Sequence, residues 1–311
     1  MESTLDFFQN ENKNYYKNKN ILITGATGGI GTVLVETLSS LEANILLISH
    51  DESKLKTKFE KLLNDEESIN PNSSGHINFK PLNKIQYEII DLENPKEINE
   101  KFPICIKKLK ARLDNVFICH GLYSKSTIKD CNAELFDKIM NINVRSVFHI
   151  LSLSVPFLKI SKGNCVILSS MESFIPVKDG FLNTTSKAMI NSLVQNSALE
   201  LSSFGVRINA VAPGITNTEH RDHKSDENNN NINIDIGSMW KNMGINDNNN
   251  NNNNNNKGDY FPLGKKILEP SNIVDTMLFL GSDEASFITG EIIQNDNGYG
   301  INHDLSFTHN P

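Results

Sequence analysis

A run of glycines near the start of the chain has the chemistry of a phosphate-binding loop. The stretch ITGATGGIG, residues 23–31, lies between a short apolar run and an amphipathic stretch. Glycine lets the backbone turn tightly and approach a pyrophosphate, and the free amides of a following helix attract its negative charge. The sequence therefore predicts a nucleotide site, with a tight turn that binds nothing as the alternative. The candidate residues are Gly25, Thr27, Gly28, Gly29, Ile30 and Gly31.

Short apolar runs alternate with helix-like stretches along most of the chain. The runs lie at residues 21–24, 45–49, 87–90, 116–119, 165–169 and 207–212. They are continuous rather than alternating, which is typical of strands covered on both faces of a parallel sheet. Helical patterns lie between them, for example at 33–41, 135–158 and 186–201. The sequence therefore predicts a single α/β domain, a doubly wound parallel sheet of about seven strands with helices on both faces.

Composition and charge argue against several classes of function. The 311 residues carry a formal net charge of -7, whereas non-specific nucleic-acid binding needs a basic face. The four cysteines form no CxxC pair, which favours buried thiols in a reducing compartment over zinc or disulfides. The polar N-terminus lacks the apolar core of a secretion signal, and no stretch approaches the roughly 20 apolar residues of a membrane span. We expect a soluble cytoplasmic protein with no metal, membrane or nucleic-acid partner.

The glycine spacing, T-G-x-x-x-G-I-G, resembles that of the short-chain dehydrogenase/reductase family rather than the GxGxxG fingerprint. The resemblance extends from about Lys19 to Gly300. It implies a Rossmann-like fold, an NADP or NAD cofactor, and hydride transfer between nicotinamide and a carbonyl or alcohol carbon of a small molecule. Family members usually pair through two helices, which fall here at 135–158 and 186–201, so the resemblance also implies a homodimer or homotetramer.

The same resemblance assigns further cofactor contacts. The two residues that directly follow the run at 87–90 are similar to the family's adenine-contacting Asp-Leu pair. The stretch ICHG at 118–121 is similar to the family's NNAG, of which only the glycine is kept. NAVAPGITNT at 209–218 is similar to the stretch beside the nicotinamide. The positions assigned in this way are Asp91, Leu92, Cys119, His120, Gly121, Pro213, Gly214 and Thr218.

The catalytic positions follow the family pattern except at one residue. The resemblance places the family's active-site Asn at Asn143, its Ser at Ser170 and its Lys at Lys187, which also contacts the nicotinamide ribose. The family keeps a proton-transferring Tyr four residues before the Lys, and Asn183 occupies that position here. An amide can hydrogen-bond a carbonyl, but it does not titrate in the useful range. Since no Tyr lies between Ser124 and Asp259, a shifted alignment does not restore it.

Three other residues could supply the missing acid. Tyr123 follows Gly121, His120 lies in the same turn and titrates near neutrality, and Tyr260 ends a polar insert. Each has a plainer interpretation, respectively as a pocket wall, a turn residue and a surface residue.

The choice between NADP and NAD depends on the end of the second apolar run. An acid there would bind the ribose 2′-hydroxyl of NAD and repel a 2′-phosphate. The position is Ser49, followed by His50, with Asp51 one residue late. Ser49 can donate a hydrogen bond to phosphate and His50 can add charge, which favours NADP. The alternative is that His50 is a solvated loop residue.

Two polar inserts interrupt the pattern, near 64–80 and 222–259. The second contains the homopolymer Asn248–Asn256, and Asn-rich tracts bury little surface. Apolar residues at 232–240 could cap a site or belong to a collapsed insert. The acid and imidazole cluster at 219–223 could suggest a metal, but a solvated loop explains it better. We expect a polar extension at 1–18, one domain at 19–302 and a tail at 303–311.

Two functions remain open at this point. One is an NAD(P)-dependent oxidoreductase with an altered proton-donor position. The other is a catalytically inactive nucleotide-binding protein of the same fold, acting as a redox sensor or a scaffold.

Overall fold

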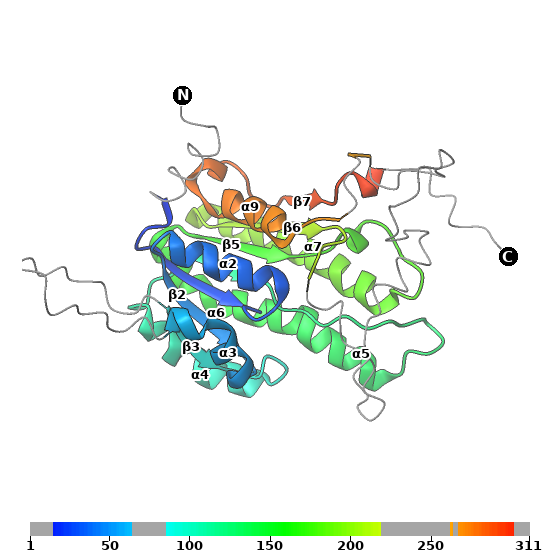
Figure 1. Ribbon diagram of the computed structural model, residues 1–311, viewed down its shortest axis with the longest axis horizontal. Helices are drawn as coiled ribbons and strands as arrows, with labels where there is room; N and C mark the ends of the chain where they lie inside the picture. Colours follow the sequence, from blue (N-terminus) through cyan, green and yellow to red (C-terminus); the bar gives the residue numbers. More distant parts are fainter. Residues whose placement is uncertain (1–14, 64–84, 219–261, 264–266, 302–311) are drawn as a thin grey trace, which may run out of the picture.

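Seven parallel strands form one sheet in the residues that the computed structural model describes, which are 15–63, 85–218, 262–263 and 267–301. The order across the sheet is β3-β2-β1-β4-β5-β6-β7 (Figure 1). The strands are β1 (Asn20–Thr24), β2 (Asn44–Ser49), β3 (Ile85–Ile89), β4 (Asn115–Ile118), β5 (Asn164–Leu168), β6 (Arg207–Pro213) and β7 (Ile292–Asn295). The predicted doubly wound sheet in a single domain is confirmed.

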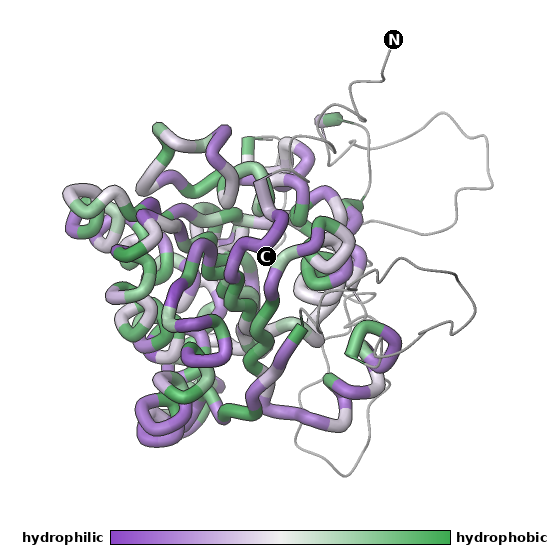
Figure 2. The backbone as a smooth tube through the Cα atoms, turned by 90° about the vertical axis from the view of Figure 1, so that its left-hand side faces the viewer, coloured by the Kyte–Doolittle hydropathy of each residue, from purple (hydrophilic) through white to green (hydrophobic). Residues whose placement is uncertain are grey.

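Both faces of the sheet are buried, as the continuous apolar runs predict. Along β1, Ile21 and Ile23 belong to one core cluster and Leu22 belongs to the other, because neighbouring side chains point to opposite faces. Hydrophobic segments accordingly run through the middle of the molecule (Figure 2). The first cluster is covered by α2 (Gly29–Ser40), α3 (Glu52–Leu63) and α9 (Pro270–Gly281), and the second by α4 (Pro95–Lys108), α6 (Ser146–Ser161) and α7 (Phe181–Leu201).

Local capping chemistry explains where several helices begin. Asn94 accepts hydrogen bonds from the amides of Lys96 and Glu97 at the start of α4, and Pro95 occupies its first turn. Glu269 and Asn272 form a reciprocal capping box on α9. Helix α2 differs, because it starts after Gly28 with no side-chain cap.

The predicted helix at 135–158 is a longer and less regular element. It consists of α5 (Ala133–Met140), a π-helical segment (Asn141–Arg145) and α6. A π segment inserts wider i→i+5 turns into a helix and is often found at functional sites. Helix α7 begins at Phe181 rather than Ser186, and β7 was not among the six apolar runs.

The continuous helical run from 133 to 161 is also long and apolar enough to cross a membrane by length and composition. Core helices of globular proteins pass the same test, so this is weak support for a membrane role. In this fold α6 packs against α4 and β4.

The end of the predicted polar extension belongs to the packed domain. Tyr16 is fully buried, and its hydroxyl donates a hydrogen bond to Leu278 O in α9 at 2.6 Å. Residues 1–14 of that extension, the predicted inserts and the tail lie outside the described residues.

Candidate functional site

The strand order reverses direction between β1 and β4, at the middle of the sheet. Thr24 at the end of β1 pairs with Ile118 at the end of β4, and the strand order runs in opposite directions from this pair. In open α/β sheets, ligands bind outside the strand ends at such a switch point. The glycine stretch follows β1 directly into this position.

Two glycines of the loop have no room for a larger side chain, whereas a third has space beside it. Gly25 has a φ of +70°, and a Cβ there would collide with the backbone of His120. A Cβ at Gly31 would collide with Gly25 O. At Gly28 the nearest atom would be Gly25 O at 3.4 Å, an ordinary contact. Gly28 therefore leaves room for a small group beside the start of α2, which has no side-chain cap, and this suits an anion.

The remaining residues of the glycine loop contact neighbouring elements. Thr27 O accepts a hydrogen bond from Lys58 Nζ of α3 at 3.3 Å, and Ile30 packs against the core beneath α2. A Cβ at Gly29 would lie 2.6 Å from Thr218 Cβ. The segment after β6 thus reaches back to the glycine loop, which brings together two stretches far apart in sequence.

The segment between β6 and Thr218 is held by the end of β7. Pro213 is the last residue of β6 and pairs with Asn295. A Cβ at Gly214 would lie 2.7 Å from Asp296 Cα, so glycine is required for this close approach.

Asn143 holds the loop after β4 against α7. Its side chain is 1% exposed and lies in the π-helical segment. Its Oδ1 accepts a hydrogen bond from Leu122 N at 2.7 Å, and its Nδ2 donates to Leu122 O at 2.8 Å and to Ser186 Oγ at 3.1 Å. Every polar atom of this amide therefore has a protein partner.

Lys187, in α7, lies close to the same loop after β4. Its Nζ donates a hydrogen bond to Leu168 O, at the end of β5, at 2.8 Å. A Cβ at Gly121 would lie 3.6 Å from both Lys187 Nζ and Asn143 Oδ1, so the three residues are neighbours. Burial lowers the pKa of Lys187 to about 8, against the opposing effects of Cys119 and Glu172. Lys187 is thus still mainly protonated at neutral pH.

Asn183 forms a pair with an acid that was not among the residues expected from the sequence. Its side chain is 6% exposed, and its Nδ2 donates a hydrogen bond to Glu172 Oε2 at 2.5 Å. Glu172 lies in the 3-10 turn after β5, and its amide donates to Ser170 Oγ at 3.2 Å. Its only sequence signal was an acid two residues after Ser170.

Glu172 as a whole residue is 8% exposed. Burial raises the pKa of Glu172, while the Asn183 hydrogen bond and the charge of Lys187 lower it. The net direction is upward, so the neutral acid is favoured relative to an ordinary glutamate.

His120, which follows β4, is hydrogen-bonded to both β1 and α6. Its Nδ1 lies 2.7 Å from Thr24 Oγ1, and its Nε2 lies 2.6 Å from Ser146 Oγ. Burial and the charge of Lys187 lower the pKa of His120 to about 3. The imidazole is therefore neutral at pH 7, which agrees with a structural role in the turn.

Tyr123 and Cys119 are protonated at neutral pH. Burial, with the charges of Glu172 and Asp179, raises the pKa of the half-buried Tyr123 to about 12. Burial raises the pKa of the Cys119 thiol to about 12 as well. Neither group is an activated base or nucleophile.

The predicted adenine-side residues follow β2 and β3, and β1 with its glycine loop separates these strands from β4 and β5. Ser49 ends β2, and its Oγ accepts a hydrogen bond from Asp51 N at 3.2 Å and donates to Asp51 O at 3.3 Å. His50 is exposed. Asp91 is exposed beyond β3, and Leu92 packs against the core.

Two earlier candidates fall outside the described residues. They are Tyr260 and the cluster at 219–223. Within the described part of the chain, no group of three or more His, Cys, Asp or Glu residues could hold a metal ion.

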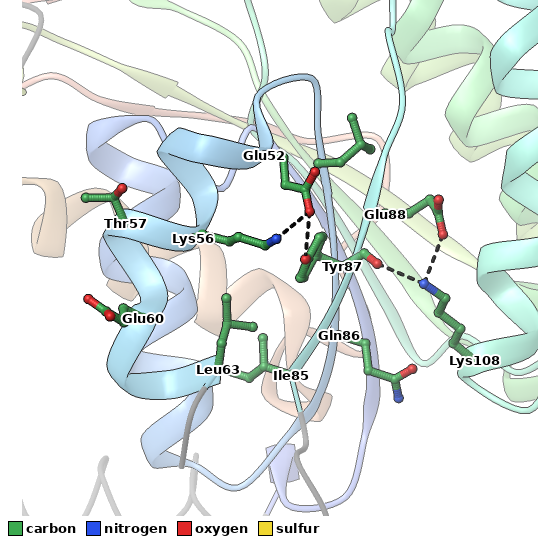
Figure 3. A pocket seen from close by; sticks show the side chains of 11 residues that line it. Glu52, Lys56, Thr57, Glu60, Leu63, Ile85, Gln86, Tyr87, Glu88 and Lys108 are labelled. Carbon is green, nitrogen blue, oxygen red and sulfur yellow. Dashed lines mark hydrogen bonds and ion pairs between the residues drawn. The ribbon is translucent and has the colours of Figure 1, made fainter. Parts of the chain in front are cut away.

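A separate hollow lies at the β3 edge of the sheet (Figure 3). Four of its charged side chains form two ion pairs. Glu52 Oε1 binds Lys56 Nζ at 2.7 Å and accepts a hydrogen bond from the Tyr87 hydroxyl at 3.0 Å, and Lys108 Nζ binds Glu88 Oε2 at 2.9 Å. Since β2, β1 and β4 separate β3 from β5, this hollow is distinct from the group formed by Glu172, Asn183 and Lys187.

Comparisons with known proteins give the same assignment as the geometry. The family model described as short chain dehydrogenase matches residues 19–229. A chloroplastic tropinone reductase homolog of Arabidopsis thaliana is 28% identical over 283 residues, covering 90% of this chain and 75% of the relative.

Two solved structures share the fold. A short chain dehydrogenase from Leptospira borgpetersenii with bound NAD+ has a TM-score of 0.68 at 20% identity, covering 93% of this chain and 95% of that one. A 3-ketoacyl-(acyl-carrier-protein) reductase from Brucella melitensis complexed with NADH has a TM-score of 0.70 at 18% identity, covering 92% and 99%.

A doubly wound parallel sheet with a glycine loop at its switch point defines an α/β domain of the Rossmann type. The family match specifies which one. The chain belongs to the short-chain dehydrogenase family, as the resemblance predicted.

Proposed function

We propose that the protein is an oxidoreductase that moves hydride between a nicotinamide nucleotide and the carbonyl or alcohol carbon of a small molecule. The main support is the juxtaposition of Asn143 and Lys187 around Gly121, beside a glycine loop whose helix has no side-chain cap. The space at Gly28 and the uncapped first turn of α2 fit a pyrophosphate. The bound nucleotide would supply or accept the hydride, and the protein would bind, orient and manage one proton.

The residues of the cluster divide this work. Lys187, protonated at neutral pH, would hold the nucleotide ribose hydroxyls. Ser170, at the end of β5, would orient the substrate oxygen. Asn143 would anchor a water while keeping the loop after β4 in place. Asn183 would act through hydrogen bonding, since its amide cannot exchange a proton in the useful range.

We further propose NADP as the preferred nucleotide, with NAD as the alternative. The support is Ser49 in place of an acid and the exposed His50 beside it. The two structural relatives described above contain NAD+ and NADH, which agrees with a nicotinamide cofactor and leaves the 2′-phosphate question to experiment.

The deciding experiment is a titration of the purified protein with NADPH and NADH, followed by nicotinamide fluorescence. We expect saturable binding, tighter for NADPH, followed by turnover with a reactive dicarbonyl such as 2,3-butanedione. Lys187→Met should weaken nucleotide binding, whereas Lys129→Met, an exposed lysine in the loop before α5, should not. If neither nucleotide binds, the proposal fails.

A second candidate is a nucleotide-binding protein without turnover, acting as a redox sensor or scaffold. The observation that favours it is the commitment of Asn183 to Glu172 at the position of the missing Tyr. Nucleotide binding without reduction of any dicarbonyl would select this candidate.

We also propose a homodimer or homotetramer. Phe148 of α6 and Met189 of α7 are exposed, 57% and 47% respectively, and line one apolar groove. The other apolar residues of this groove are Met140, Val144 and Leu193. Phe148→Glu should shift the mass measured by light scattering to that of a monomer, whereas Phe287→Glu, at a fully exposed site, should not.

Finally, we propose that the protein works in the cytoplasm. All four cysteines are free thiols in the structure, which suits a reducing compartment.

A further inference from the structure

Glu172 is a buried ionisable group to which the proposed function gives no role. The residue is 8% exposed, and Oε2 is held by Asn183 Nδ2 at 2.5 Å. Among the described residues, no other hydrogen bond to this carboxyl is found. A buried carboxyl group with a single amide partner costs free energy of folding, because burial disfavours its charged form. Such a group is therefore a candidate for a functional role.

The position of Glu172 relative to Ser170 is fixed by one short turn. Ser170 Oγ accepts the amide of Glu172 at 3.2 Å, so the hydroxyl that would orient a substrate oxygen and the carboxyl belong to the same 3-10 turn. Asn183, at the position of the family's Tyr, fixes the carboxyl from α7. The carboxyl group is therefore within hydrogen-bond distance of the residue that occupies the position of the family's proton donor.

We propose that Glu172 is the proton donor for carbonyl reduction, with Asn183 as the residue that positions its carboxyl group. This inference rests on the proposed oxidoreductase function. As hydride adds to the carbonyl carbon, the C=O π electrons move to oxygen, and that oxygen takes the proton of the Glu172 carboxyl. The hydride comes from the reduced nicotinamide nucleotide, and the resulting carboxylate takes up one H+ from solvent. The carbonyl, the reduced nucleotide and one proton thus give the alcohol and the oxidised nucleotide. In the oxidation direction the carboxylate accepts the proton of the alcohol.

The groups that face Glu172 allow both protonation states. The charge of Lys187 stabilises the carboxylate after proton transfer, and burial favours the neutral acid before it. Tyr123, in the loop after β4, interacts electrostatically with both Glu172 and Asp179. The raised pKa brings the carboxyl closer to neutral pH, where a general acid is most effective.

The other candidate donors fit less well. His120 is neutral and engaged on both ring nitrogens by Thr24 and Ser146. Tyr123 keeps its proton, because its pKa is raised to about 12. The causes of this shift are burial, Glu172 and Asp179, and none of them is a cation that would lower the pKa.

The experiment compares Glu172→Gln with Asp179→Asn. The control removes a nearby carboxylate that does not contact Asn183, and Asn tolerates the φ of +62° at this position. Each variant is measured for NADPH affinity by fluorescence, for kcat and KM with 2,3-butanedione between pH 5 and 9, and for urea unfolding at pH 4.5 and 7.

We expect Glu172→Gln to lower kcat by about 10²–10⁴-fold, the range for loss of a general acid, with NADPH affinity retained. The wild-type kcat for reduction should fall as pH rises through the carboxyl pKa, and that fall should vanish in the variant. The wild type should also lose stability relative to Glu172→Gln as pH rises above 4.5. Asp179→Asn should behave as the wild type in all three measurements.

A double variant separates a chemical role from a structural one. Asn183→Tyr restores the family's acid, so Glu172→Gln should cost much less in that background than in the wild type. An equal cost in both backgrounds would show a structural role and overturn the proposal. If Glu172→Gln does not fold, Glu172→Asp is measured instead. A change in the pH at which kcat falls supports the proposal, and an unchanged pH overturns it.

The remaining outcomes distinguish the two proposals. If the wild type is active and Glu172→Gln keeps its kcat and pH profile, the assignment of Glu172 is wrong while the oxidoreductase function stands. Loss of kcat in Tyr123→Phe with Glu172→Gln still active would also overturn it. If the wild type binds NADPH and reduces no dicarbonyl, both proposals fail.

Discussion

The side-chain amide of Asn183 and the carboxyl of Glu172 form a 2.5 Å hydrogen bond in which both groups are buried. Asn183→Leu removes the amide donor and leaves the Glu172 carboxyl without this hydrogen bond. Since that hydrogen bond lowers the pKa of Glu172, we expect the pKa to rise further in the variant. The variant should lose about 1–3 kcal/mol of unfolding free energy, the cost of an unsatisfied buried polar group.

The sign of the pH effect follows from the raised pKa. Above the unfolded-state value of about 4.5 the unfolded chain releases its proton first, so stability falls as pH rises. The deficit of Asn183→Leu should therefore be larger at pH 7 than at pH 4.5 in urea unfolding. Asn196→Leu, at an exposed Asn of the same helix, should change stability by less than about 0.5 kcal/mol. A deficit that does not depend on pH would contradict the role assigned to this hydrogen bond.

The fold could be predicted from the sequence because it depends on local patterns. Continuous apolar runs specify strands buried on both faces, and the glycine spacing specifies the loop after β1. The pairing of Glu172 with Asn183 could not be predicted, because it depends on how the turn after β5 packs against α7. The π segment at Asn143 was missed for a related reason. Its residues have ordinary helical periodicity, and tertiary hydrogen bonds to Leu122 and Ser186 accompany the wider turn.

His120 makes stability depend on pH in the acid range. Its folded-state pKa is lowered to about 3 from an ordinary value of 6.5. As pH falls below 6.5 the unfolded chain takes up the proton first, so the contribution of His120 is complete above 6.5 and is lost toward pH 3. His120→Ala should be less stable at pH 7, by about 1–3 kcal/mol for two lost hydrogen bonds.

The difference between wild type and His120→Ala should then shrink as pH falls from 7 to 4, which urea unfolding at several pH values measures. Ser146→Ala removes only one of the two partners and should show a smaller loss at pH 7. A constant difference across this range would show that the imidazole is not held in its neutral form.

Gly25 and Gly28 should respond differently to the same substitution. Gly25→Ala forces a side chain onto a backbone with φ +70° and against the backbone of His120, so it should destabilise the fold by at least about 1–2 kcal/mol. Gly28→Ala meets no atom closer than 3.4 Å and should melt at nearly the wild-type temperature. Its added methyl occupies the space left for a pyrophosphate, so NADPH affinity should fall. Normal NADPH affinity in Gly28→Ala would place the phosphates elsewhere.

Ser49 is the position at which nucleotide preference should be switched. An aspartate there would repel a 2′-phosphate and could accept a hydrogen bond from a 2′-hydroxyl. We expect Ser49→Asp to shift the ratio of NADPH to NADH affinity by at least about tenfold toward NADH, equivalent to about 1.4 kcal/mol. The loss for NADPH should lessen at high salt, because the repulsion is electrostatic. Ser53→Asp places the same charge on an exposed residue of α3 and should leave the ratio nearly unchanged. An equal shift in both variants would indicate a general charge effect, and no shift in Ser49→Asp would mean that the adenosine ribose does not lie at the end of β2.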